Sequence, residues 1–405
     1  MLGLTQAYVT PLALALKATT QQVGLLASIP TFATAVSQLA APAISDTAGS
    51  RKKLILPIVF MHAILWLPIL LVPYLMVTGR IWWLIAFVTL SAILGLFAGP
   101  AWGSLMADLV PAHMRGRYFA FRARISVLTM LVFGLIAGGI LQIFQNISKQ
   151  SGETLFTGFA VIFGGALIFR LLSVYFLLGM YEPRQSGSSK RGQSLFYLLT
   201  HLGTSNLGRF ILFVALIGFG ANIAAPFFSV YELRDLKFNY ATYMIISLCN
   251  ALAQFAFQAF WGRRADRAGN VMLLKVASSL IPFVPLIWML NKNPFYLMGA
   301  EVFSGLAWSG FNLAASNFIY DASEPENRTK QLAILNAFNM LGGALGAVVG
   351  GYITPHLPSF LGYNLRSLML ISGLARGLVV LIFVRSIVEV RHVPKISLKQ
   401  FILGN

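Results

Sequence analysis

Twelve apolar stretches, eleven of them about 20 residues long or longer, constrain this 405-residue sequence more than any other feature. A helix needs about 20 mostly apolar residues to cross the hydrocarbon core of a membrane, and it satisfies its own backbone hydrogen bonds there. We therefore predict an all-α membrane protein with twelve transmembrane helices. The predicted spans are residues 2–16, 21–44, 54–77, 81–107, 118–146, 155–179, 206–231, 240–261, 271–290, 294–320, 331–354 and 364–388.

The composition supports this fold class, because only 10% of the residues are charged and the mean hydropathy is +0.76. Soluble domains of this size need far more polar surface. The first span is short, since fifteen helical residues reach only about 22 Å. We expect either that the bilayer thins around it or that the natural start lies upstream, and no signal peptide is recognisable.

The basic residues are divided unequally between alternate loops. The net charge is +18, and twenty Lys and Arg residues fall in one set of alternate loops against six in the other. The positive-inside rule then places the richer set, and both termini, in the cytoplasm of a cell with a bacterial-style inner membrane. The charge therefore predicts orientation and contact with anionic membrane lipids, and we expect no nucleic-acid partner.

Two halves of six spans are separated by a polar segment. We assign residues 1–181 to an N-terminal half, 182–205 to a cytoplasmic linker that can include an amphipathic helix, 206–390 to a C-terminal half and 391–405 to a cytoplasmic tail. Motifs recur between the halves in the same order: Asp46 and Gly49 with Asp266 and Gly269, Asp108 and Arg115 with Asp321 and Arg328, Arg170 and Glu182 with Arg376 and Glu389. This order predicts an internal duplication, as found in many secondary transporters.

The loop after the eighth span carries the motif with the clearest family resemblance. Residues 262–269 read Gly-Arg-Arg-Ala-Asp-Arg-Ala-Gly, and residues 42–49 keep Asp46 and Gly49 but have Pro42 and Thr47 in place of Gly and Arg. On these residues the chain resembles bacterial members of the major facilitator superfamily (MFS). The resemblance implies two pseudo-symmetric six-helix bundles, alternating access, a monomer, and a cytoplasmic gate. The implied gate residues are Asp46, Gly49, Arg51, Asp108, Arg115, Asp266, Arg267, Gly269 and Arg328.

Glu301 is the clearest candidate for a functional residue within a span, since charge inside a membrane is costly. It begins a stripe at helical spacing that also contains Ser304, Trp308, Asn312 and Ser316. The family resemblance implies that the tenth span lines the transport path. Glu301 can then exchange a proton during transport. The alternative is a Glu that only packs against Arg366 or a water molecule.

Other polar residues within spans are candidates for substrate binding or for contacts between helices. They are Gln6, Tyr8, Asn222, Asn336, Asn339, Arg170 and Arg376, with Thr10, Gln38, Asn250 and Gln254 as further helix-contact residues. The two arginines hold matching repeat positions, which favours a structural role in bonding carbonyls or acidic residues of a neighbouring helix. Direct substrate contact becomes the better interpretation if the substrate is an anion.

Prolines and glycines indicate where the spans break and pack. Pro11 and Pro226, at matching positions of the first and seventh spans, are expected to break the helices and free carbonyl groups. Gly134 and Gly138, and the glycines between Gly342 and Gly351, predict seams of small residues where helices approach closely.

Several activities are excluded by missing motifs. No Lys follows a Gly, no metal-ligand spacing occurs among the five His, and no Gly-x-Ser-x-Gly sequence is present. We therefore predict no enzyme activity, no metal and no cofactor. The predicted function is secondary transport across the plasma membrane, by proton-coupled efflux of an amphipathic or lipophilic small molecule. Uptake of a small polar solute with protons or another coupling ion, and a non-transporting scaffold or lipid-moving protein, remain the alternatives.

Overall fold

A computed structural model of the chain describes residues 1–47, 50–111, 114–151, 155–182, 205–322, 328–391, 393 and 400–401. Throughout this part the chain is helical apart from turns and one isolated bridge between Phe360 and Tyr363. The all-α prediction is therefore confirmed. The proposed amphipathic helix of the linker lies outside the described residues.

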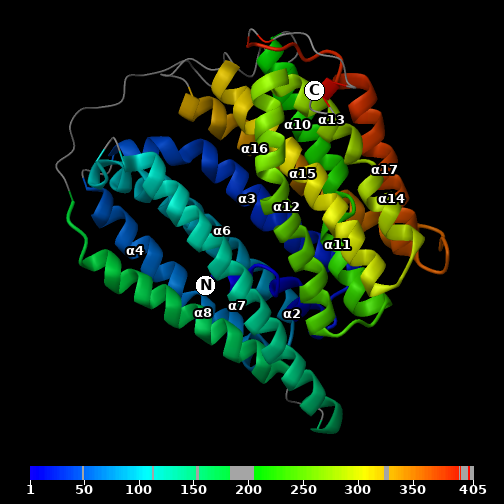
Figure 1. The fold of residues 1–405 in the computed structure, drawn as a ribbon. Helices are drawn as coiled ribbons and strands as arrows, with labels where there is room; N and C mark the ends of the chain where they lie inside the picture. The colour runs from blue at the N-terminus through cyan, green and yellow to red at the C-terminus, as the bar shows by residue number, and fades with distance from the viewer. Residues whose placement is uncertain are drawn as a thin grey trace. The chain divides into compact units, whose positions relative to one another are not determined.

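The chain separates into two compact units, and the first comprises Met1–Ser189 together with Ser229–Met244. Its helices run from blue to green in Figure 1, where α4 and α8 lie side by side although they are far apart in sequence. They are α1 (Leu2–Thr5), α2 (Val9–Ala15), α3 (Thr20–Thr47), α4 (Arg51–Ile64), α5 (Trp66–Leu75), α6 (Arg80–Leu109), α7 (Arg115–Ser151) and α8 (Leu155–Leu178).

The second unit comprises Lys190–Phe228 and Ile245–Asn405. Its helices are α10 (Asn206–Asn222), α11 (Ala225–Val230), α12 (Tyr240–Ala268), α13 (Asn270–Leu280), α14 (Phe283–Leu290), α15 (Pro294–Ala322), α16 (Arg328–Ile353) and α17 (Asn364–Phe383), with a short 3₁₀ turn at Thr354–His356. The last residues of α11, the π-helix Tyr231–Asp235 and the first residues of α12 are the segment that groups with the first unit.

Helices occupy all twelve predicted ranges, and within the described part nine spans are long and apolar enough to cross a membrane. The remaining three predicted spans each differ for a visible reason. The first is divided between the short helices α1 and α2, and the side chains of α3 beyond residue 38 lie outside the described part. The tenth, α15, has 29 residues but carries the polar stripe that begins at Glu301.

Four spans break close to the fourth residue before a proline. The breaks fall near Ala7, Ile64, Asn222 and Ile281, which precede Pro11, Pro68, Pro226 and Pro285 by four residues. A proline has no N–H for the carbonyl four residues earlier, and its ring clashes with that carbonyl. The predicted breaks at Pro11 and Pro226 are confirmed, and the structure adds two more in the third and ninth spans.

The small-residue seams are also present. A Cβ atom on Gly342 or Gly346 of α16 would collide with backbone oxygens of α10, and one on Gly350 with the carbonyl of Ile223 just after α10, so these two helices pack backbone to backbone. Gly134 and Gly138 of α7 leave room for Met244 in the same way. The predicted seams are confirmed, and they fix the helices that carry the polar residues described below.

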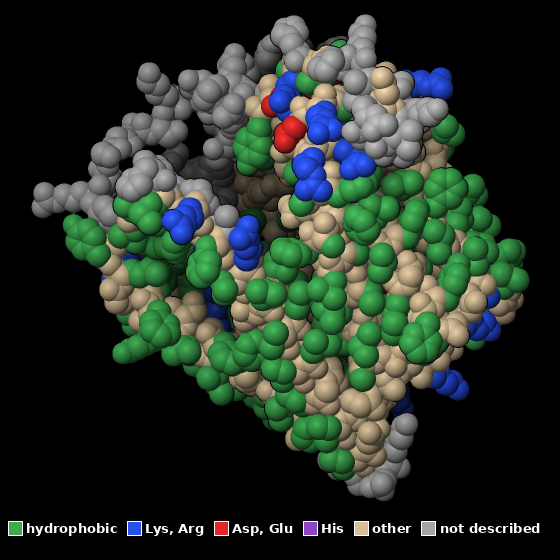
Figure 2. Space-filling view, viewed as in Figure 1, with side chains coloured by type: hydrophobic (Ala, Val, Ile, Leu, Met, Phe, Trp, Pro, Cys, Tyr) green, Lys and Arg blue, Asp and Glu red, His purple; other side chains and the backbone are tan. Residues whose placement is uncertain are grey.

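Figure 2 shows many hydrophobic side chains on the surface of the molecule, whereas Lys and Arg appear at fewer places. The exposed apolar residues of the described part include Trp82, Trp83, Phe255 and Leu378. An exposed apolar surface of this kind suits contact with lipid acyl chains.

Candidate functional site

Glu301 lies on α15 with its carboxylate against the end of α14. The indole Nε1–H of Trp288 donates to Glu301 Oε1 over 3.0 Å, and the Trp288 side chain is 1% exposed. The ring of Phe228, from α11, lies 4.7 Å from the Trp288 ring, centroid to centroid. The carboxylate therefore meets a buried donor that is itself packed against the Phe228 ring.

A second set of bonds joins the same part of α15 to α12. The Asn250 amide donates to Ser304 Oγ over 3.0 Å and to the Glu301 carbonyl over 3.4 Å, and the Gln254 amide donates to Asn250 Oδ1 over 2.6 Å. Gly305 allows this contact, because a Cβ there would meet the backbone of Asn250. Asn250, expected to join helices, does so beside Glu301, while Gln254 bonds Asn250 within α12.

The rest of the stripe is more open. Trp308 is half-buried and packs edge-on against Phe311, while Asn312 and Ser316 are exposed. Arg366, the alternative contact expected for Glu301, donates to the Leu361 carbonyl over 3.1 Å. The structure thus brings Glu301 together with Trp288, Asn250 and Ser304. Asn312 and Ser316, further along the stripe, are exposed and accessible for a ligand.

Arg376 is buried in α17, with 2% of its surface exposed. Its guanidinium donates to three carbonyl oxygens, those of Gly220 at 3.4 Å, Ala221 at 3.1 Å and Ile281 at 3.3 Å. The expectation that this arginine bonds carbonyls of neighbouring helices is confirmed. Its donors are engaged by the protein, which argues against direct contact with substrate.

Arg170, at the matching position of the first unit, has a different partner. Its Nε–H donates to Nδ1 of the buried His62 over 3.0 Å, close to the break between α4 and α5. The expected carbonyl or carboxylate partner is replaced by an imidazole ring. Because Nδ1 accepts this bond, His62 carries its proton on Nε2.

The candidates of the first span separate into one buried and one exposed residue. The Tyr8 hydroxyl is buried and donates to the Gly134 carbonyl of α7 over 2.5 Å, which makes Tyr8 a contact between helices. Gln6 is exposed at the break between α1 and α2. Of the two, Gln6 is the side chain available to a ligand.

The three asparagine candidates of the second unit lie around the contact of α10 with α16. Asn222 is half-buried and donates to the Gly218 carbonyl over 2.9 Å, one turn back on its own helix. Asn339 lies against Gly218, which has no room for a Cβ, and both Asn339 and Asn336 are exposed. Asn222 and Asn339 therefore both lie near Gly218 at the contact of α10 with α16, and Asn336 lies one turn before Asn339.

The gate motif is described in full only in the second unit. Gly269 precedes α13 with a φ of +87°, and Asp266 and Arg267 are exposed at the end of α12. Gly49 lies outside the described residues, and so do the side chains of Asp46, Arg51, Asp108, Arg115 and Arg328. Their predicted role in a gate stays a prediction.

Two carboxylates that the sequence reading placed in the repeat, without a role, hold the starts of α4 and α13. Glu182 accepts from the Lys52 N–H at 3.2 Å and from the Ser50 hydroxyl at 2.6 Å, and Glu389 accepts from the Val271 N–H at 2.8 Å. Each binds the second residue of its helix, where backbone N–H groups have no helical partner. Their shared repeat position was the available signal.

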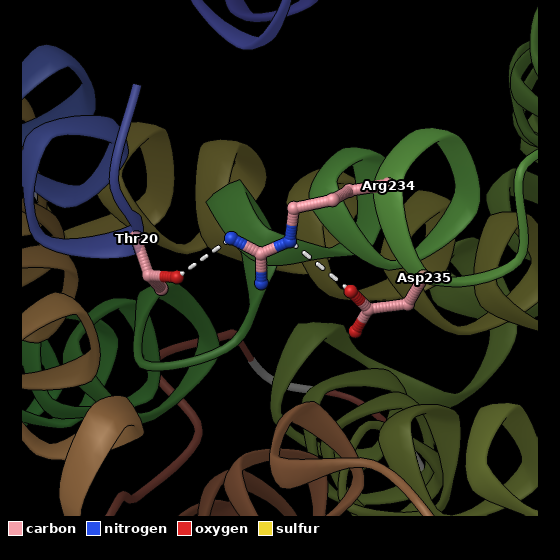
Figure 3. Close-up of polar contacts among 3 residues, drawn as sticks. All are labelled: Thr20, Arg234 and Asp235. Carbon is pink, nitrogen blue, oxygen red and sulfur yellow. Dashed lines mark hydrogen bonds and ion pairs between the residues drawn. The ribbon is translucent and has the colours of Figure 1, made fainter. Parts of the chain in front are cut away.

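Residues 229–244 bring a further polar cluster to the first unit. Arg234 in the π-helix donates to the Thr20 hydroxyl at the start of α3 over 3.0 Å, and pairs with Asp235 at 3.1 Å (Figure 3). The Tyr243 hydroxyl donates over 2.9 Å to the Ala7 carbonyl, which Pro11 leaves without its helical donor. Glu232, 3% exposed, is a buried carboxyl in this segment. Sequence reading did not single out these contacts.

Among the described residues, no three His, Cys, Asp or Glu side chains lie close enough together to bind a metal ion. The polar groups that do gather are suited to hydrogen bonding and proton exchange. They are a carboxylate with an indole donor, amides, and exposed side chains on α15 and α16.

Comparison with known proteins finds similarity both in sequence and in structure. The quinolone resistance protein NorA of Staphylococcus aureus is 24% identical over 193 residues, and the chain spans about half of its length, 46% of each protein. A mutant of the nucleoside transporter NupG has a TM-score of 0.68 at 15% identity, covering 94% of this chain and 95% of that one. A bacterial homologue of the human lysosomal transporter Spinster has a TM-score of 0.63 at 15% identity, covering 95% and 91%.

The two structural likenesses show a shared fold. At the level of the family, a sequence model of the Major Facilitator Superfamily matches residues 2–219 and 210–401, so it covers both halves of the chain. The motifs, the helical fold and this match agree, and the chain is a multi-pass membrane protein that belongs to the Major Facilitator Superfamily of transporters.

Proposed function

We propose that this transporter exports amphipathic or lipophilic small molecules in exchange for protons, and that Glu301 carries the proton. The observation that supports this most is the placement of the Glu301 carboxylate in a membrane-spanning helix, bonded to the Trp288 indole and beside the amide of Asn250. A carboxylate in a span is costly to keep unless it acts in transport. A scaffold has no need of it.

The direction of transport is supported by the relative named for drug resistance. A membrane transporter protects a cell from a quinolone by moving the drug out, and NorA is similar to this chain over 193 residues. The half-buried Trp308 and the exposed Asn312 offer one aromatic and one amide group along α15. Such a surface suits a ligand with an apolar body and a few polar atoms.

The setting we propose follows from the charge distribution and the family. The protein lies in the bacterial inner membrane as a monomer, with both termini in the cytoplasm and anionic lipid headgroups against its basic loops. Its two halves alternate access to a central path, and the loops that contain Asp46 and Asp266 form the cytoplasmic gate.

The test uses purified protein in liposomes that contain a pH-sensitive dye. A quinolone, a lipophilic cation, a nucleoside, a dipeptide, a sugar and an organic acid are each added to wild type, Glu301→Gln and Glu301→Asp. We expect the quinolone or the lipophilic cation to cause proton flux in wild type. In Glu301→Gln this flux should be at least tenfold lower. Glu301→Asp keeps a titratable group and should retain coupling at a lower rate.

Two results would contradict the proposal in different parts. Movement of substrate with unchanged proton flux in Glu301→Gln would remove Glu301 from coupling. Proton-coupled movement of only the nucleoside, dipeptide or sugar would replace export of lipophilic compounds by uptake of a polar solute. Because Gln keeps the size and the acceptor oxygen of Glu, a loss of flux in that variant reports the proton rather than a packing defect.

A further inference from the structure

We infer that Arg376 is a positioning residue for Glu301, and that it acts through two helix breaks that it ties together. This inference rests on the proposed role of Glu301 and adds the group that holds its surroundings in place. The guanidinium lies on α17, and the helices that it bonds, α10 and the α13–α14 pair, come from two other spans.

The carbonyls that Arg376 bonds lie at the two breaks, where regular helical partners are missing. Pro285 stands four residues after Ile281 and has no N–H to give to its carbonyl, which accepts from the Val284 N–H at 3.3 Å and from Arg376 at 3.3 Å. At the other break the Ala224 N–H turns to the Ala221 carbonyl, three residues back, at 3.2 Å. The Gly220 carbonyl, four residues back, instead accepts from Arg376 and from the Ser372 hydroxyl at 2.6 Å.

An arginine suits this position because its planar guanidinium carries five N–H donors in a fixed arrangement. One side chain can therefore serve carbonyls of two different helices at once. A lysine has a single ammonium group and cannot reach both breaks with the same geometry. The bonds fix α10, α13 and α17 to each other at the points where two spans are interrupted.

The helices that follow the two breaks meet beside Glu301. α11 follows the first break and carries Phe228, while α14 follows the second and carries Trp288. The two rings lie 4.7 Å apart, and Trp288 donates to the Glu301 carboxylate over 3.0 Å. Arg376 therefore sets the directions of both helices that place the indole donor on the carboxylate.

The packing of α17 on α14 supports this path. A Cβ atom on Gly373, one turn before Gly377, would crowd Leu286 of α14 and the Pro282 carbonyl at the break. The matching arginine of the first unit bonds the His62 ring instead of a set of carbonyls. The arrangement around Arg376 is thus particular to the half that contains Glu301.

The test needs no substrate. The protein is produced with 5-fluorotryptophan, reconstituted in lipid nanodiscs and examined by ¹⁹F NMR, where Trp288→Phe identifies the Trp288 resonance among the seven tryptophans. In the wild-type background Glu301→Gln should shift this resonance. In Arg376→Gln the Trp288 resonance should move, and Glu301→Gln should then cause no further shift.

Resonances of Trp66, Trp82 and Trp102 serve as the control for folding, since these residues lie in the other unit. If they hold their positions and Trp288 responds to Glu301→Gln as in wild type, the inference is overturned. If Arg376→Gln fails to fold, Arg376→Lys and Ser372→Ala take its place. An unmoved Trp288 resonance in both would equally overturn the inference, and a shift in both would support it.

Transport measurements separate this inference from the proposed function. In the liposome assay with the quinolone, Arg376→Gln should reduce proton flux at least fivefold more than it reduces substrate binding. If Glu301→Gln leaves proton flux unchanged, the proposed function fails. If Glu301→Gln abolishes flux while Arg376→Gln leaves both flux and the Trp288 resonance intact, only the positioning role fails.

Discussion

Gly269 shows how much a single residue decides at the gate motif. Its backbone, with φ +87° and ψ 164°, lies in a region that is open essentially to glycine alone, and it directs the chain into α13. Beside it the Glu389 carboxylate binds the Val271 N–H, leaving no space for a Cβ on Gly269. The turn and the carboxylate together start the helix.

We therefore expect Gly269→Ala to destabilise the protein by about 1–3 kcal/mol, from backbone strain and from displacement of the Glu389 carboxylate. The measurement is the thermal unfolding midpoint in detergent, followed by intrinsic tryptophan fluorescence. Gly164→Ala in α8, where a Cβ meets nothing within 4 Å, is the matched control and should leave the midpoint unchanged or raise it. Equal midpoints for the two variants would contradict the strain.

Residues differ in how visible their roles are in the sequence. Glu301 is visible because an acidic residue in an apolar stretch has few uses, whereas Trp288 resembles any other aromatic residue of a span. The partner of a buried group depends on which helices pack together. Helical periodicity predicts which residues share a face of a helix, but it does not predict which helix packs against that face. The sequence predicts that Arg376 bonds carbonyls or acidic residues of a neighbouring helix. Which carbonyls accept these bonds depends on the packing of the helices and was not predictable.

At the scale of elements, prolines determine where spans are interrupted. The breaks in the first and seventh spans follow from Pro11 and Pro226, and the same rule accounts for those before Pro68 and Pro285. Proline position alone is insufficient, because α4 continues through Pro57 without interruption. Tertiary partners serve carbonyls at three of the four breaks: Tyr243 in the first span, and Arg376 in the seventh and ninth spans.

Restoring an N–H at residue 226 tests whether the break in the seventh span serves transport. Pro226→Ala lets the Asn222 carbonyl regain a helical partner. We expect the free energy of unfolding to rise by up to about 3 kcal/mol, with a higher unfolding midpoint. We expect the turnover rate to fall several-fold. The rate is measured with the quinolone in liposomes. Pro57→Ala, in the uninterrupted α4, should stabilise without slowing transport. Unchanged turnover in Pro226→Ala would show that the break is only structural.

At the scale of the whole molecule, the sequence repeat and the compact units do not coincide. The repeat divides the chain at a central linker, yet Ser229–Met244 of the second half groups with the first unit. Three contacts join this segment to the first unit. Tyr243 donates to the Ala7 carbonyl, Arg234 donates to Thr20, and Met244 packs against Gly134 and Gly138. Such contacts arise from side chains that meet only after folding, so duplication in the sequence could not reveal them.

The orientation of the whole molecule follows from charge and can be tested with one chemical probe. Cys249 is the single cysteine, so a Cys249→Ala background allows new cysteines to be placed one at a time. Lys292, before α15, belongs to the loops poor in basic residues, and Arg263, near the end of α12, belongs to the rich set. The positive-inside rule predicts that Lys292→Cys reacts with an impermeant maleimide in intact cells, while Arg263→Cys reacts only after the membrane is opened. The reverse pattern would place both termini outside. It would also place the loop of Gly269, and the Glu389 segment that packs beside it, on the outside, because helix connectivity fixes which loops share a side once one loop is assigned.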